Sequence, residues 1–453
     1  MRIAELKLKN IRAIGADFPA IAFSANRNAT VFLGDNGCGK TTILDSIALL
    51  ISPFLSQFPS VPDKMISDWD VHIDCDGRMS DYLGLGARFV TDSGQEIEEL
   101  RTRKGRAKAP ESDLKDIKQF ALEFRNGIVH GDDDVQLPVF AYYGTGRGSI
   151  NAPERKRNFQ KVFERWDCYN NALTPSTDFK SFFAWFDLME DEERRERERL
   201  RDFDYRLPAL EAVRRALANF VGGKFHSPRI ELHPLRFVMT EEGRGKRDRV
   251  LRIEQMSDGY KIMIAMVADI ASRMAEANPG APDPLQTSGI ILIDELDLHL
   301  HPRWQRVVVR QLLATFPNIQ FIVTTHSPVI VAGASDCAQI IHLDNNERFD
   351  DVRMSQNLST MDIGQILLSD LFGLGSLRSP VWDMSLQRRD ELLAKPELDT
   401  DEAGELSRLN EKLAVLQTGD TPNDIEALRL LREIAGKPQT ISSSISISLH
   451  RSS

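Results

Sequence analysis

The chain has 453 residues, of which 42% are hydrophobic and 27% charged, and its formal net charge is −10. This composition is typical of a globular protein with roughly two to three domain-sized units, and the negative charge argues against a protein that coats nucleic acid over its whole surface. No apolar run is long enough to span a membrane, and the start of the chain alternates like a strand instead of forming an apolar signal peptide. We therefore expect a cytoplasmic protein that makes no membrane contact.

A glycine-rich loop follows the first buried strand that the sequence predicts. AlaThrValPheLeu at 29–33 predicts that strand, GlyAspAsnGlyCysGlyLysThr at 34–41 fits the pattern G-x-x-x-x-G-K-[ST], and an apolar helix follows. This order predicts a phosphate-binding loop. We expect Lys40 to reach the β- and γ-phosphates and Thr41 to offer its hydroxyl to Mg²⁺. The residues expected to bind the nucleotide here are Gly34, Asn36, Gly37, Gly39, Lys40, Thr41 and Thr42.

The middle of the chain has no motif of comparable strength. Residues 85–143 predict β-structure interrupted by a polar stretch at 101–116, and residues 153–221 predict helices. The charge-dense run at 190–199 is interpreted as a solvated helix face. Three basic clusters could each be a solvated loop or a contact with DNA or RNA, and the sequence leaves both open; they are residues 101–108, 154–165 and 244–252.

Strands and helices alternate between residues 255 and 345. The sequence predicts helices and apolar strands in turn, at 258–276, 289–294, 303–315, 319–324 and 338–343. This alternation favours a mainly parallel sheet with its ligand at the carboxyl ends of the strands.

Two of these strands end in side chains suited to phosphate chemistry. IleIleLeuIleAspGlu at 290–295 ends in two acids, of which Asp294 is expected to hold Mg²⁺ and Glu295 to act as general base on an attacking water. The next strand runs into ThrThrHisSerPro at 324–328, where His326 is placed to sense the γ-phosphate. Paired with the loop at 34–41, these residues indicate hydrolysis of a nucleoside triphosphate.

MetSerAspGlyTyrLys at 256–261 opens the predicted helix at 258–276. Ser257 is a natural N-cap, so it could serve only to begin that helix. Its position shortly before the strand at 290–295 favours a second interpretation. In that interpretation Ser257 and Gly259 form a signature motif that contacts the γ-phosphate bound by another subunit.

Taken in order, these motifs, with HisLeuHisPro at 299–302 between the acids and His326, resemble the ABC-like ATPase heads of RecF, SMC and OLD proteins. Residues 288–305 and 316–328 are similar to AAA-family ATPases of bacterial anti-phage defence, such as the Septu ATPase subunit. The resemblance implies an α/β fold, with an ABC-ATPase-like P-loop head, a mixed β-sheet, a helical insertion lobe and a C-terminal helical unit. It also implies ATP and Mg²⁺ as cofactors, and a homodimer or higher homo-oligomer that binds two ATP between head-to-tail heads.

The resemblance and the pattern of the chain together predict five segments. They are ATPase lobe I at 1–150, a helical insertion at 151–225, ATPase lobe II at 226–350, a helical C-terminal unit at 351–436 and a flexible tail at 437–453.

Some positions depart from the family pattern or match it weakly. Asp258 stands where transporters have Gly and His301 where many heads have Asp, which argues against a transporter ATPase. Gln136 is a weak candidate for the Q-loop glutamine. Arg12 either resembles the family's arginine near the nucleotide or is a surface residue, and Arg147 is expected near phosphate or at the dimer seam.

We expect an ATPase, with slow turnover allowed, and no nuclease activity of its own, because the acids at 399–402 lie in a polar stretch instead of after apolar strands. The predicted function is a sensor or regulator in an anti-phage complex with a companion effector of the HNH-nuclease type. The alternative is a RecF-like repair ATPase that binds DNA as a dimeric clamp. Residues 355–435, with Ile363, Ile366, Leu367 and Leu371 on one helix face, either dock the partner or pack onto the head.

Overall fold

The computed structural model describes residues 1–132, 135–148, 163–175, 179–232, 235–243, 247–344, 349–351, 358–395 and 398–413. Contacts divide the chain into two units, residues 1–374 and 375–453. The predicted tail at 437–453 and most of the basic cluster at 154–165 lie outside the described residues. No helix in the described ranges is long and apolar enough to cross a membrane.

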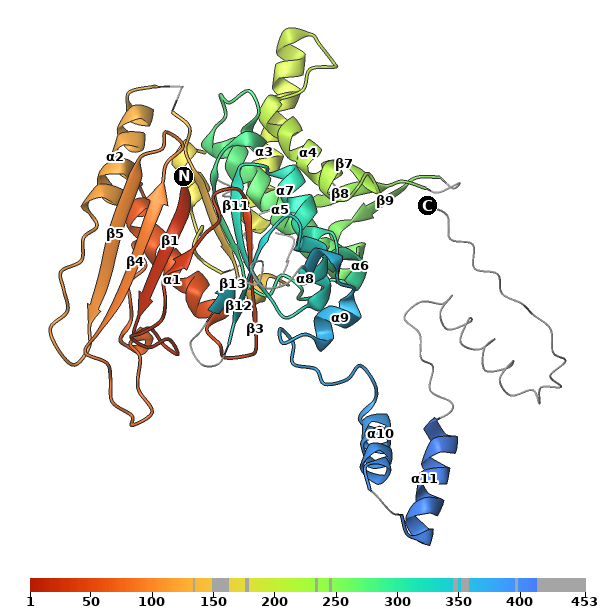
Figure 1. Ribbon diagram of the computed structural model, residues 1–453. Coiled ribbons are helices and arrows are strands. Elements are labelled where there is room, and N and C mark those ends of the chain that lie inside the picture. The colour runs from red at the N-terminus through yellow and green to blue at the C-terminus, as the bar shows by residue number, and fades with distance from the viewer. Residues whose placement is uncertain are drawn as a thin grey trace, which may run out of the picture. The chain divides into compact units, whose positions relative to one another are not determined.

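A six-stranded sheet with the order β13-β12-β3-β11-β10-β6 forms the centre of unit 1 (Figure 1). Neighbouring strands are parallel except for the edge pair β12–β13. The strands β3, β10 and β11 are fully buried and mostly apolar, as expected for a parallel sheet covered on both faces. The predicted α/β fold with a mixed sheet is confirmed. The strands are β3 (Ala29–Gly34), β6 (Val139–Tyr143), β10 (Gly289–Ile293), β11 (Ile319–Thr325), β12 (Gln339–Leu343) and β13 (Phe349–Asp351).

The register of this sheet brings separate motifs to one edge. Ile293 of β10 pairs with Val323 of β11, and Thr325 of β11 pairs with Leu33 of β3. Because the strands are parallel, the loops after β3, β10 and β11 all leave from the same edge. Ligands of open α/β sheets bind at this carboxyl edge.

A second, antiparallel sheet has the order β2-β1-β4-β5. Its strands are β1 (Arg2–Lys9), β2 (Ile21–Ala22), β4 (Tyr82–Val90) and β5 (Glu96–Lys104), and it packs with the helices α1 (Lys40–Leu55) and α2 (Lys115–Val129). The prediction of interrupted β-structure over 85–143 is wrong for α2. Ile117 and Ala121 are buried one turn apart, and Phe124 and Ile128 continue the same apolar face.

Helices cover the central sheet. A small antiparallel sheet with the order β7-β8-β9 precedes α5, the helix that begins in the predicted signature motif at 256–261. The single helix predicted at 303–315 is interrupted at Arg306 and Val307 and forms two short helices. The elements are α3 (Phe179–Leu200), α4 (Pro208–Phe220), β7 (Phe225–Leu232), β8 (Leu235–Glu241), β9 (Arg249–Arg252), α5 (Asp258–Ala277), α6 (Pro302–Gln305), α7 (Val308–Thr315), α8 (Pro328–Ala334) and α9 (Ile363–Leu368).

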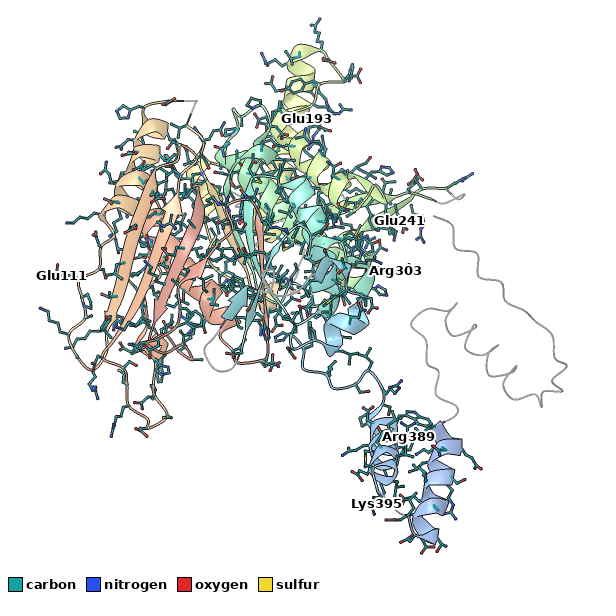
Figure 2. All side chains as sticks on the ribbon, viewed as in Figure 1. Glu111, Glu193, Glu241, Arg303, Arg389 and Lys395 are labelled. Atoms are coloured by element: carbon teal, nitrogen blue, oxygen red, sulfur yellow. The ribbon has the colours of Figure 1, made fainter. Side chains whose placement is uncertain are left out.

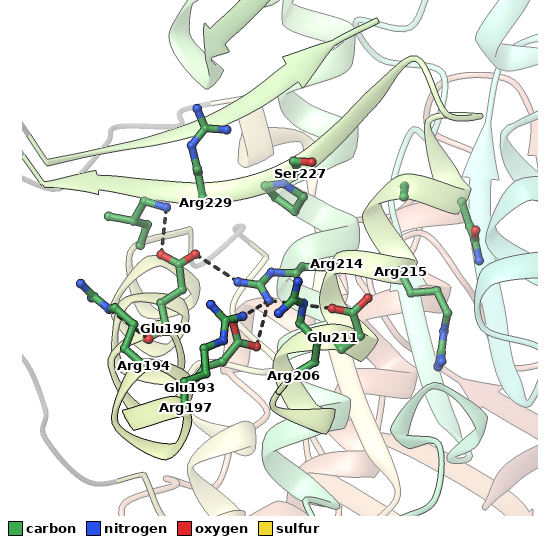
Figure 3. A pocket seen from close by; sticks show the side chains of 14 residues that line it. Glu190, Glu193, Arg194, Arg197, Arg206, Glu211, Arg214, Arg215, Ser227 and Arg229 are labelled. Atoms are coloured by element: carbon green, nitrogen blue, oxygen red, sulfur yellow. Dashed lines mark hydrogen bonds and ion pairs between the residues drawn. The ribbon is translucent and has the colours of Figure 1, made fainter. Parts of the chain in front are cut away.

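The charge-dense run at 190–199 is only partly a solvated helix face. Glu190 and Glu193 turn inward to a cavity of about 710 Å³ between α3, α4 and β7 (Figure 3). Arg214 of α4 binds Glu190 at 3.2 Å and Glu193 at 3.0 Å, and Glu193 also binds Arg197 at 2.5 Å. The prediction is therefore wrong for these two glutamates, whose ion pairs hold α3 against α4.

The polar lining of this cavity is electrically balanced by its surroundings. The remaining ion pairs join arginines of the lining to acids that lie in or beside it, and they are Arg214–Glu211, Arg194–Asp191, Arg215–Asp283 and Arg229–Glu231. Since each of these arginines has a carboxylate partner, we interpret the cavity as a structural ion-pair network.

Unit 2 contains two described helices, α10 (Pro380–Leu393) and α11 (Thr400–Leu413). Arg388 of α10 binds Glu405 of α11 at 2.9 Å, and the Lys412 ammonium lies 5.5 Å from the centre of the Trp382 ring. Arg389 of α10 pairs with the neighbouring Asp390 at 2.7 Å (Figure 2).

The apolar stripe predicted at 363–371 belongs to unit 1. Ile366 and Leu371 are buried in the core of the head together with Leu358, and α9 packs against α8. For this segment the structure therefore supports packing onto the head over partner docking.

Candidate nucleotide-binding site

The glycine-rich loop joins β3 to α1. Gly37 and Gly39 have φ of 88° and 98°, which side chains other than glycine rarely tolerate. The Lys40 ammonium turns back into the loop and donates to the carbonyl oxygens of Gly34 at 2.8 Å and Asp35 at 2.7 Å. A phosphate in the loop can replace these carbonyls as acceptor, while the N-terminus of α1 adds positive potential.

Asp294 follows β10 at the carboxyl edge and meets residues from two other elements. Thr41 at the start of α1 donates its hydroxyl to one carboxylate oxygen at 2.9 Å, and Thr324 of β11 donates to the other at 2.6 Å. The Thr324 hydroxyl also accepts the backbone N–H of Glu295 at 2.7 Å. Thr324 therefore fixes both acids, although no sequence motif assigned it a role. The available signal was a pair of threonines at the end of a buried strand, directly before His326.

Glu295 and His326 line one cavity of about 210 Å³ together with the glycine-rich loop. Glu295 has φ 47°, the left-handed conformation that is uncommon for side chains other than glycine. Asp297 accepts from the Thr325 hydroxyl at 2.6 Å and from the backbone N–H of His326 at 3.3 Å. The lining consists of Asn36, Gly37, Gly39, Lys40, Thr41, Thr42, Asp294, Glu295 and His326.

These residues fit a triphosphate with Mg²⁺. Lys40 and the loop backbone supply the donors that phosphate oxygens require, and the neighbouring Thr41 hydroxyl and Asp294 carboxylate are the hard oxygen ligands that Mg²⁺ prefers. No group of three or more His, Cys, Asp or Glu in the described ranges forms a metal site. A cation held by Thr41 and Asp294 would therefore share its coordination with phosphate oxygens and water.

The predicted signature residues Ser257 and Gly259 lie in a different cavity of about 680 Å³ with His299 and His301. Ser257 occupies the N-cap position of α5, but its side chain makes no capping hydrogen bond. A Cβ on Gly259 would approach the His299 carbonyl oxygen to 3.0 Å, so the close packing of α5 on this loop favours glycine. The Ser257 hydroxyl is therefore not used as a cap.

Three weaker sequence predictions are placed as follows. Arg12 binds Asp45 at 2.5 Å and Asp70 at 2.9 Å, beside α1 and outside the lining of the nucleotide cavity. Gln136 precedes β6, which runs parallel to β10, so it lies at the opposite edge from Asp294 and is not a Q-loop residue of this site. Arg147 was expected near phosphate or at a dimer seam, but it is buried behind the nucleotide cavity.

A triphosphate cradle and two strand-end acids on one sheet edge, with a signature serine in a separate cavity, define a P-loop ATPase of the ABC-like type. Residues 169–332 match the family described as "AAA domain, putative AbiEii toxin, Type IV TA system", and residues 5–218 match the family described as "AAA domain". The chain is therefore similar to AAA-family ATPases of the ABC-like type, and it resembles the Septu ATPase subunit PtuA.

Relatives of this kind cover most of the chain. "Retron Ec83 probable ATPase" of Escherichia coli is 29% identical over 77% of this chain and 72% of its own length. "Retron Vc95 probable ATPase" of Vibrio cholerae is 26% identical over 72% of each. Septu protein PtuA of Bacillus mycoides is 34% identical over 36% of this chain and 22% of its own length.

Solved SMC heads are similar to part of the chain. The SMC head domain of Thermotoga maritima has a TM-score of 0.42 and 17% identity, covering 76% of this chain and 94% of that one. The Smc head domain of Pyrococcus furiosus has a TM-score of 0.44 and 17% identity, covering 75% and 93%.

Proposed function

We propose that the chain binds and hydrolyses ATP in a head-to-tail dimer, and that this cycle regulates a companion effector in defence against phage. The observation that carries the ATPase proposal is the single cavity in which Lys40, Thr41, Asp294, Glu295 and His326 meet. The likeness to the retron ATPases and to PtuA supports the defence role.

In this proposal each residue has one task. Lys40 binds the β- and γ-phosphates, and Thr41 and Asp294 hold Mg²⁺, which neutralises phosphate charge when bound. Glu295 accepts the proton of the attacking water, and His326 contacts the γ-phosphate. These roles are consistent with the side chains that face the cavity.

The separation of the two cavities supports the proposed dimer. Ser257 and Gly259 line a cavity other than the one that holds Lys40, so within one subunit they do not share a ligand with it. A second subunit placed head to tail would bring its Ser257 to the γ-phosphate and close two identical sites. ATP would then stabilise the dimer by linkage.

We propose that the effector is a separate nuclease of the HNH type and that it docks on unit 2. Val381 and Met384 of α10 are 60% and 70% exposed, which makes them candidates for apolar contact with a partner. Contact with DNA or RNA and a cytoplasmic location remain parts of this proposal.

Two substitutions test the ATPase proposal. Lys40→Ala should abolish ATP binding, because it removes the phosphate-binding ammonium. Glu295→Gln should bind ATP and lose turnover, since the amide cannot accept the proton of the water. Binding is measured by calorimetry and turnover by phosphate release. Turnover at the wild-type rate in Glu295→Gln would place the base elsewhere.

A further inference from the structure

Arg147 is a buried cation that contacts the backbone of Asp294 and Glu295, the two acids that follow β10. It lies in the 3₁₀ turn Thr145–Gly148 that follows β6, and only 2% of the residue is exposed. Asp294, Asp297 and Glu295 are the charges that act on it most strongly, while burial lowers the pKa of its guanidinium. A buried arginine without strong partners would be destabilising, so its contacts define its task.

The guanidinium binds the backbone of both acids. One terminal nitrogen donates to the carbonyl oxygens of Asp294 at 2.5 Å and Gly144 at 3.1 Å, and the other donates to the carbonyl oxygen of Glu295 at 2.5 Å. β6 adds a further bond at this place, because the Tyr143 carbonyl accepts the backbone N–H of Asp294 at 2.8 Å. The planar fork of an arginine can join two successive carbonyls in a way that lysine cannot.

The backbone held in this way is strained. Glu295 has φ 47°, and the left-handed conformation is unfavourable for a residue with a side chain. Such a conformation persists only where its surroundings impose it. Here the Thr324 hydroxyl accepts a hydrogen bond from the backbone N–H of Glu295, and Arg147 donates one to the carbonyl oxygen of Glu295. Both peptide groups of Glu295 are therefore held by side chains from neighbouring strands or turns.

We infer that Arg147 is the positioning residue for the Glu295 carboxylate: its fork fixes the Asp294–Glu295 turn so that Glu295 points into the nucleotide cavity. The inference rests on the proposed function, in which Glu295 is the general base. A displacement of about 1 Å at a reacting group can reduce a rate on the order of a hundredfold. Arg147 should thus control kcat without touching ATP.

The test uses the full-length chain with Arg147→Lys and Arg147→Ala. Both variants should bind ATP within about threefold of wild type, because the Lys40 loop is untouched, and both should lose about tenfold to a hundredfold in kcat. Millimolar methylguanidine should restore part of the kcat of Arg147→Ala and none of that of Glu295→Gln. A purely structural arginine would lower the unfolding temperature without a selective loss of kcat or its rescue.

Arg101→Lys is the matched control. Arg101 is also buried, and it also donates to backbone carbonyls, those of Leu49 and Lys64. It lies in β5 and pairs with Asp63 at 3.1 Å instead of binding the Asp294–Glu295 turn. Its variant should lose stability and keep kcat. If Arg147→Ala does not fold, the kcat of Arg147→Lys alone tests whether Arg147 positions Glu295.

The outcomes separate this inference from the proposed function. Wild-type kcat in Arg147→Lys, together with an inactive Glu295→Gln, overturns the role of Arg147 and leaves the proposed function standing. Turnover in Glu295→Gln overturns the proposed function itself. Equal losses of kcat in Arg147→Lys and Arg101→Lys would make Arg147 structural only.

Discussion

Thr324 satisfies two buried polar groups at once, the Asp294 carboxylate and the Glu295 N–H. We predict that Thr324→Val, which keeps the shape and removes the hydroxyl, leaves both without this partner. Each such loss costs about 1–3 kcal/mol, so the free energy of unfolding and kcat should both fall. Urea unfolding and phosphate release measure the two effects.

Thr315→Val is the control for Thr324→Val. The Thr315 hydroxyl is buried as well, but it only donates to the Gln311 carbonyl within its own helix. We expect a smaller loss of stability and unchanged kcat. An active and fully stable Thr324→Val would show that the two acids do not depend on this hydroxyl.

Glu276 near the end of α5 gives a prediction on pH. Burial raises its pKa from 4.5 to about 8, against the attraction of Arg273. One carboxyl oxygen has no hydrogen-bond partner among the described residues. Because the folded state holds this proton more tightly than the unfolded state, its contribution is complete below about pH 4.5 and is lost as pH rises to 8.

Glu276→Gln should therefore make the free energy of unfolding fall less between pH 4.5 and 8 than it does in the wild type. At about 1.4 kcal/mol per pKa unit, the difference amounts to several kcal/mol at most. Unfolding free energies measured at intervals between pH 5 and 8 test this. The exposed Glu111→Gln serves as control and should leave the slope unchanged. The same slope in Glu276→Gln as in wild type would mean that Glu276 ionises normally.

The residues of the glycine-rich loop and the strand-end acids could be placed from the sequence, because their roles follow from short motifs beside predicted strands. The contacts of Arg147 and Thr324 could not be assigned, since Arg147 binds the Asp294 and Glu295 carbonyls and Thr324 binds the Asp294 carboxylate and the Glu295 N–H, and only the register of the sheet brings these groups near. Gln136 was misplaced for the same reason, as the direction of β6 relative to β10 decides which end faces the site.

At the scale of elements, the core helices and strands were predictable because their apolar patterns are continuous. α2 was missed because a polar stretch precedes it and its buried face is narrow. The inward turn of Glu190 and Glu193 depends on Arg214 of another helix, which a run of alternating charges does not reveal. The boundary before unit 2 also depends on packing, since α9 joins the head.

This boundary predicts the behaviour of two truncations. A chain ending at Leu374 keeps Leu358, Ile366 and Leu371, whereas a chain ending at Ser355 loses these core residues. Burial of each such side chain stabilises the fold by about 1.5–3 kcal/mol. Only the chain that ends at Leu374 should therefore remain soluble, with the ATP affinity of the full chain. Calorimetric ATP binding and unfolding temperature compare the two.

The chain that ends at Leu374 lacks unit 2, so it also tests unit 2 as the docking surface. Under the proposed function it should fail to retain the companion protein in a pull-down while binding ATP normally. Retention of that protein would move the docking surface to the head, and a soluble, stable chain ending at Ser355 would contradict the core role of α9.

At the scale of the whole molecule, the head-to-tail arrangement predicts which pairs of defects can complement each other. Under the proposed function, Lys40 and Ser257 of one subunit serve different sites of the dimer, which agrees with their separate cavities in one subunit. Lys40→Ala and Ser257→Arg should each inactivate a homodimer completely, since both sites are then broken. A mixed dimer with one substitution on each subunit behaves differently.

In that mixed dimer, one site combines Lys40→Ala with Ser257→Arg and is doubly broken, while the other combines a wild-type Lys40 with a wild-type Ser257. One of the two sites should remain, provided that the sites work independently, so purified heterodimer should release phosphate at about half the wild-type rate. The same substitutions placed on a single subunit, paired with a wild-type subunit, break one partner of each site and should leave no activity. This difference between trans and cis does not depend on whether ATP or another contact holds the dimer together. Activity in the cis heterodimer with none in the trans heterodimer would place Lys40 and Ser257 in one site within each subunit, and equal residual activity in the two would show that Ser257 belongs to no ATP site.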